Sequence, residues 1–152
     1  MSKKKLYNEV IQFAIDKEQE AIDLYTDMVK RTRTSSGKIV FNELADMEKG
    51  HKRKLQKLDM SYFSAQKLRS VEDLKIADYL IDVPLKPDSE YQDILLYAAK
   101  REKAAFNLYS DLAHAYATVP QITKMFQVLA QEEATHKLKL EREYDENVYK
   151  ED

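Results

Sequence analysis

Two Glu-x-x-His motifs are the residues in this sequence best suited to chemistry, Glu48–His51 and Glu133–His136. Residues three apart on a helix lie on one face, about one turn from each other. Apolar residues flank both motifs at helical spacing, so we expect each pair to point into a hydrophobic core. One such motif is weak evidence for a metal site because surface Glu and His residues often share this spacing. Two of the three histidines carry it here.

Two further glutamates, Glu18 and Glu102, interrupt the apolar stripes of two other segments. Four buried carboxylates would repel one another, and burying an unpaired charge is costly. Two divalent cations would balance the four negative charges, and two neutral imidazoles would complete the ligand set. Oxygen and imidazole ligands favour iron or manganese, and Fe/Fe, Mn/Fe and Mn/Mn pairs all fit. We therefore predict a two-metal site with six ligands: Glu18, Glu48, His51, Glu102, Glu133 and His136.

Other polar residues lie near these positions along the chain. Tyr25 and Tyr109 each follow an inward glutamate by seven residues, two turns along the same face. They are either core aromatics whose hydroxyls find a partner, or residues that hydrogen-bond a ligand carboxylate or supply an electron. We expect Glu20 and Glu132 to project into solvent, and His114 to be an ordinary surface or groove histidine.

Four amphipathic segments position these residues, at about 5–31, 38–58, 89–117 and 119–147. The first and last breaks between them are short, which predicts two antiparallel helical hairpins. A long crossover, 59–88, joins the hairpins and is expected to contain a short helix around 71–80. This pattern predicts an all-α, ferritin-like four-helix bundle, with residues 1–152 forming a single domain.

Polar residues mark the expected helix starts. The cluster at 34–37 offers an N-cap to the second helix, and Ser89 has capping-box spacing to Gln92. Thr118 is the expected cap of the fourth helix, with Pro120 in its first turn.

The two hairpins repeat each other. Residues 18–25 resemble residues 102–109, 84 positions later. Residues of the second helix recur in the fourth at an offset of 85: Phe41, Leu44, Glu48, His51 and Leu55 become Phe126, Leu129, Glu133, His136 and Leu140. This indicates a duplicated helical hairpin. The alternative is a structural repeat whose matched Glu and His residues lie on the surface.

Composition narrows the function classes. Two Gly and three Pro are too few for an all-β protein with many tight turns. A net charge of −2 with mixed signs argues against a nucleic-acid partner, and no apolar run is long enough for a membrane span. The chain has no Cys, hence no disulfide and no thiolate metal site. We expect a cytoplasmic protein.

These motifs resemble the rubrerythrin family of ferritin-like di-iron proteins, over residues 5–58 and 89–147. The resemblance implies that Glu18 and Glu102 are terminal carboxylates and that Glu48 and Glu133 bridge two iron ions. It also implies terminal imidazoles from His51 and His136, and it matches Tyr25 and Tyr109 to tyrosines that flank such sites. A chain without Cys lacks the rubredoxin domain of longer members. Nor does it have a carboxylate one turn from Glu102, where some members have an additional ligand.

The resemblance implies a redox enzyme that reacts its reduced metal pair with hydrogen peroxide or O2 and takes electrons from an external donor. Peroxide reductase and ferroxidase activities would use the same residues. The alternatives are a non-catalytic iron-binding or storage protein and a helical interaction module without metal. Family members commonly pair through helix faces, so we expect a homo-oligomer, a dimer in the first instance.

Overall fold

The computed structural model describes residues 3–58, 79–81, 85–86 and 88–149, with side chains assigned for 9–58, 79–81, 85–86 and 88–147. Helices account for most of these residues. Their bounds are α1 Lys3–Arg31, α2 Ser35–Gln56, α3 Tyr91–Ala115 and α4 Pro120–Tyr149. Each helix begins and ends within three residues of the range expected from the sequence.

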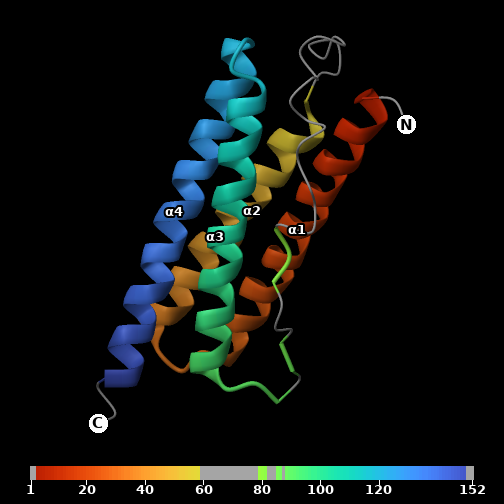
Figure 1. Cartoon of the computed structure of the whole chain (residues 1–152). Coiled ribbons are helices and arrows are strands. Elements are labelled where there is room, and N and C mark those ends of the chain that lie inside the picture. The colour runs from red at the N-terminus through yellow and green to blue at the C-terminus, as the bar shows by residue number, and fades with distance from the viewer. Residues whose placement is uncertain (1–2, 59–78, 82–84, 87, 150–152) are drawn as a thin grey trace.

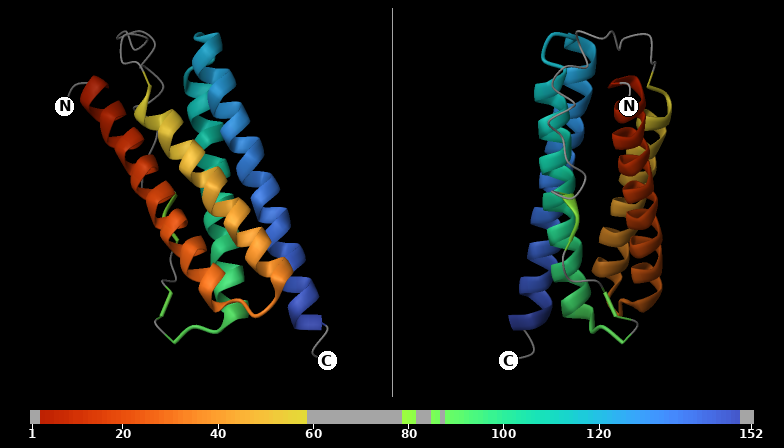
Figure 2. Two further views of the ribbon diagram at one scale, coloured as in Figure 1. Left: turned by 180° about the vertical axis from the view of Figure 1, so that it is seen from behind. Right: turned by 45° about the vertical axis from the view of Figure 1, so that its right-hand side comes forward.

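The four helices form two hairpins packed face to face. α1 packs against α2, and α3 packs against α4. Figure 1 shows the α1–α2 turn and the α3–α4 turn at opposite ends of the bundle, and Figure 2 shows the hairpins as two layers. α2 ends at the end of the bundle opposite to that where α3 begins (Figure 1). The predicted ferritin-like four-helix bundle is confirmed.

The helix starts follow the sequence in part. The Thr34 hydroxyl caps α2 by accepting a hydrogen bond of 3.0 Å from the Gly37 amide, as expected. The capping box expected at Ser89 is wrong: Glu90 is the N-cap of α3, and its side chain makes no capping hydrogen bond. The Ser89 hydroxyl instead accepts a hydrogen bond from the Lys86 amide, which holds a turn before the helix.

Two apolar clusters fill the core and leave a polar layer between them. One cluster contains residues such as Ala14, Leu55 and Phe126, and the other contains residues such as Met28, Phe41 and Leu140. In every helix the predicted metal ligands fall between residues of the two clusters. Close apolar packing on both sides therefore fixes the helices around the polar layer.

The crossover is described only at its C-terminal part. The Tyr79 hydroxyl donates a hydrogen bond of 2.6 Å to Asp111, which attaches the crossover to α3. The expected helix at 71–80 lies almost wholly outside the described residues. No helix among the described residues is long and apolar enough to cross a membrane.

Candidate metal centre

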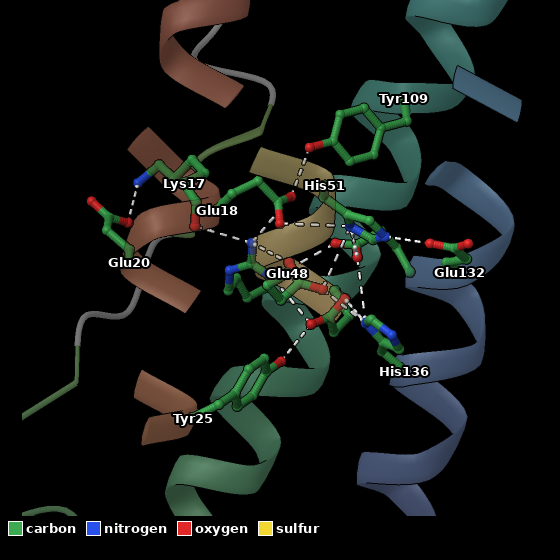
Figure 3. Close-up of polar contacts among 12 residues, drawn as sticks. Lys17, Glu18, Glu20, Tyr25, Glu48, His51, Tyr109, Glu132 and His136 are labelled. Atoms are coloured by element: carbon green, nitrogen blue, oxygen red, sulfur yellow. Dashed lines mark hydrogen bonds and ion pairs between the residues drawn. The ribbon is translucent and has the colours of Figure 1, made fainter. Parts of the chain in front are cut away.

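All six predicted ligand side chains meet in the polar layer. Their exposed fractions are at most 1%, although each is a charged or titratable group. Glu18 comes from α1, Glu48 and His51 from α2, and the other three from α3 and α4. Figure 3 shows the polar ends of Glu18, Glu48, His51 and His136 converging between the two hairpins. The six residues expected from the sequence therefore lie together in the core.

The cluster divides into two overlapping groups of donor atoms. One group is Glu18, Glu48, His51 and Glu133, and the other is Glu48, Glu102, Glu133 and His136. Within each group, one ligand atom from each residue lies within 4.8 Å of all the others. Glu48 and Glu133 belong to both groups. Two ions placed in these groups would share these two carboxylates.

The buried donor atoms fit metal ions. Both oxygens of Glu48 and Glu133, and one oxygen each of Glu18 and Glu102, lie buried without a well-aligned hydrogen bond. The Nδ1 atoms of both histidines also lie buried without a well-aligned hydrogen bond. Buried polar atoms are rarely left in this state, and a bound ion is one of the ordinary explanations. Carboxylate oxygen and imidazole nitrogen suit iron, manganese and similar divalent ions.

Gathering four carboxylates in a buried cluster shifts their pKa values in different directions. Burial and the charges of the other glutamates raise the pKa of Glu48 and of Glu133 well above the ordinary value. Burial acts in the same direction on Glu18. The adjacent Glu48 and His51 side chains and the nearby Arg101 outweigh burial and lower the pKa of Glu18 to about 2. Burial also raises the pKa of Glu102, but Arg101 and His136 outweigh it and lower the pKa. Glu18 and Glu102 thus favour the ionised form, and Glu48 and Glu133 resist it.

The same carboxylates also shift the pKa values of the two histidines. Burial lowers the pKa of His51, but the adjacent carboxylates of Glu18 and Glu48 raise it to about 9. Burial also lowers the pKa of His136, and Glu102 and Glu48 raise it to about 9. Without another cation, both imidazoles therefore hold a proton near neutral pH.

Two tyrosines reach across the bundle to Glu18 and Glu102. Tyr109 on α3 donates a hydrogen bond of 2.6 Å to Glu18 on α1. Tyr25 on α1 donates one to Glu102 on α3. Burial raises the pKa of both hydroxyls well above the ordinary value, so both keep their protons. Figure 3 shows one ring on each side of the cluster.

Glu132 differs from its sequence prediction. Its side chain is 28% exposed, and one oxygen lies 2.5 Å from Nε2 of His51. With Nδ1 of His51 facing the cluster, Nε2–H donates to Glu132, as metal-bound histidines commonly do to a carboxylate. The prediction that Glu132 is solvated was wrong. The residue pattern of α4 alone does not show that this side chain reaches His51 on α2. Glu20 and His114 are exposed as expected.

Arg101, which is not among the site residues expected from the sequence, lies inside the cluster. Its side chain is 7% exposed, and its guanidinium lies 3.1–3.7 Å from an oxygen of each of the four glutamates. Arg101 falls on an apolar stripe with heptad-like spacing, but this spacing alone does not show whether a long basic side chain folds inward. The stripe comprises Ile94, Ala98, Arg101, Ala105, Leu108 and Leu112.

A pocket of about 120 Å³ leads from the surface toward the cluster between α1 and α3. Glu18, Arg101 and Tyr109 contribute to its wall, and residues 79–81 of the crossover cover part of it. The pocket is well below the size of typical drug-sized ligand sites, which start at about 300 Å³. A small molecule suits it better than a bulky substrate.

Comparison with known proteins gives one clear result. The family model described as Rubrerythrin matches residues 3–79 and 93–152. No significant match was found among curated proteins or among solved structures. The family match spans most of the chain and includes all six predicted ligands. The fold and the buried Glu and His cluster agree with it, and the chain belongs to the rubrerythrin family.

Proposed function

We propose that this protein is a di-iron redox protein that reduces hydrogen peroxide or O2 with electrons from an external donor. The observation that carries the proposal is the pair of buried donor groups sharing Glu48 and Glu133. The chemistry supplied by a bound iron pair is two-electron reduction of a small oxidant, one electron from each metal. Manganese in one or both positions is compatible with the same donor atoms.

The chain's own residues divide the work of holding the metals. Glu48 and Glu133 lie in both donor groups and would bridge, while Glu18 and Glu102 each lie in one and would bind one metal. His51 and His136 would present Nδ1, the atom that faces the carboxylates. Every predicted ligand is buried, so bulk water is kept away from the reacting positions.

The surrounding residues orient the ligands and hold protons. The Tyr109 hydroxyl fixes one oxygen of Glu18 and leaves the other free of hydrogen bonds. Glu132 orients the His51 ring through Nε2. The pocket between α1 and α3 provides an approach of a size suited to peroxide or O2.

Rapid mixing tests the proposal. Protein loaded anaerobically with Fe(II) is mixed with peroxide or O2 in a stopped-flow spectrometer. We expect rapid appearance of a ferric-oxo absorption with at least one oxidant, and its loss in Glu48→Ala. No fast change with either oxidant, in protein that retains two iron ions, would contradict the redox function.

The same experiment can distinguish catalysis from storage. A catalytic centre should return to the ferrous state when a reductant is added and should consume further oxidant with two irons per chain. Iron retained far beyond two per chain, in a large particle by light scattering, would instead indicate a storage protein.

A further inference from the structure

Arg101 is the only basic side chain among the described residues that contacts all four glutamates of the cluster. Its closest ion pair, to Glu102, is 3.1 Å long, and those to Glu48, Glu18 and Glu133 are 3.5–3.7 Å. The same guanidinium donates a hydrogen bond of 3.1 Å to the Lys17 carbonyl. Arg101 thus sits where a cation is required if four carboxylates are to stay buried together.

The internal repeat has an equivalent basic residue in each hairpin, but only the one in the second hairpin enters the cluster. Lys17 precedes Glu18 as Arg101 precedes Glu102, 84 residues later. Lys17 nevertheless turns outward, where its ammonium is 3.0 Å from Glu20 and its side chain is 33% exposed. Two equivalent basic residues therefore have different places, and only Arg101 enters the cluster.

The four carboxylates carry too little negative charge to balance Arg101 and two divalent metal ions together. Four carboxylates carry −4, which two divalent ions already balance, so a buried guanidinium would leave an excess positive charge. Like charges a few ångströms apart in a buried site repel strongly. The guanidinium also lies within ion-pair distance of the same four carboxylates that the metal ions require.

We propose that Arg101 is a built-in counter-cation that competes with metal ions for the four carboxylates. This inference rests on the proposed metal site. In the metal-free protein the guanidinium holds the carboxylates together, and metal loading exchanges it for divalent ions. The pocket between α1 and α3 provides space for the displaced guanidinium, because its wall includes both Arg101 and Glu20.

Arg101→Gln tests the competition, with Lys17→Gln as the control at the repeat-equivalent position. The probe is Mn²⁺, whose dissociation constants are measured by competition with a fluorescent chelator, alongside thermal unfolding of the metal-free proteins. Removing a competitor raises apparent affinity by the inverse of the free fraction, so we expect Arg101→Gln to bind Mn²⁺ about tenfold more tightly or better. Its metal-free form should melt at a lower temperature. Lys17→Gln should change neither value.

Opposite changes in affinity and metal-free stability are the signature of a counter-cation. Unchanged or weaker Mn²⁺ binding by Arg101→Gln would overturn the inference while leaving the metal site intact. A wild-type protein that bound no Mn²⁺, Fe²⁺ or other divalent ion would contradict the proposed function itself. If metal-free Arg101→Gln does not fold, it should fold when Mn²⁺ is present. Failure to fold in saturating Mn²⁺ would also overturn the inference.

Discussion

Tyr109 on α3 donates a hydrogen bond to Glu18 on α1, and Tyr25 on α1 donates one to Glu102 on α3, so each of these glutamates is held by a tyrosine of the opposite hairpin. The sequence repeat placed each tyrosine seven residues after a glutamate of its own helix. The structure instead pairs them across the interface. The two hairpins are therefore joined at the site itself, as well as through the apolar clusters above and below it.

Tyr109→Phe should weaken this connection. Loss of a buried hydrogen bond to a charged group costs about 1.5–3 kcal/mol in metal-free stability. Loss of a group that orients a ligand typically costs about tenfold or more in metal affinity. Urea unfolding and chelator competition measure the two effects. Tyr144→Phe, in the apolar cluster beyond the site, serves as the control and should change metal affinity little.

Glu132 should make the two metal positions unequal. It contacts Nε2 of His51, whereas the residue at the repeat-equivalent position near the other histidine is Met47, which is 39% exposed. Glu132→Gln should therefore weaken binding of one ion by about tenfold and leave the other nearly unchanged. A two-phase chelator titration resolves the ions. Equal weakening of both ions, or of neither, would show that Glu132 does not set this difference.

Metal binding should release protons at neutral pH. The pKa values of His51 and His136 are raised to about 9 in the metal-free protein, so both imidazoles are protonated at neutral pH. Metal ligation requires the neutral ring, so full loading should release about two protons per chain or more. Calorimetry in buffers of different ionisation enthalpy counts them. A titration with no proton release would show that the histidines are neutral before loading.

The same shifts predict how metal-free stability depends on pH. A group whose pKa is raised on folding contributes stability that is complete below its unfolded value and is lost as pH rises through its folded value. For His51 and His136 this window runs from 6.5 to about 9. We expect the urea midpoint of the metal-free protein to fall across this window. His114→Gln, which changes an exposed histidine, should leave the profile unchanged.

Two glycines of α2 should respond oppositely to alanine. A Cβ at Gly37 would clash with the Thr32 hydroxyl and lie 2.8 Å from the Thr34 hydroxyl. Gly37→Ala should therefore destabilise the protein by about 1–3 kcal/mol. At Gly50 the nearest atom to a new Cβ is 3.9 Å away, so Gly50→Ala should stabilise by about 0.5–1 kcal/mol. Thermal unfolding of the metal-free variants measures both, and equal effects would contradict the steric explanation.

The sequence predicted most of the fold because periodicity and repetition are local signals. The four helices and the convergence of Glu18, Glu48 and their repeat partners followed from spacing along single helices. Arg101 and Glu132 did not follow, because each acts through contacts between helices. A pattern along one helix cannot tell whether a long side chain folds inward, as Arg101 does, or outward like Lys17.

Metal content per chain tests the central claim most directly. Wild-type protein and single variants are loaded anaerobically with Fe(II), separated from free metal by gel filtration and assayed by elemental analysis. We predict two ions per wild-type chain, one after Glu18→Ala and little or none after Glu48→Ala, because Glu48 belongs to both donor groups. Negligible metal in the wild type, or two ions retained by Glu48→Ala, would contradict a shared two-metal site.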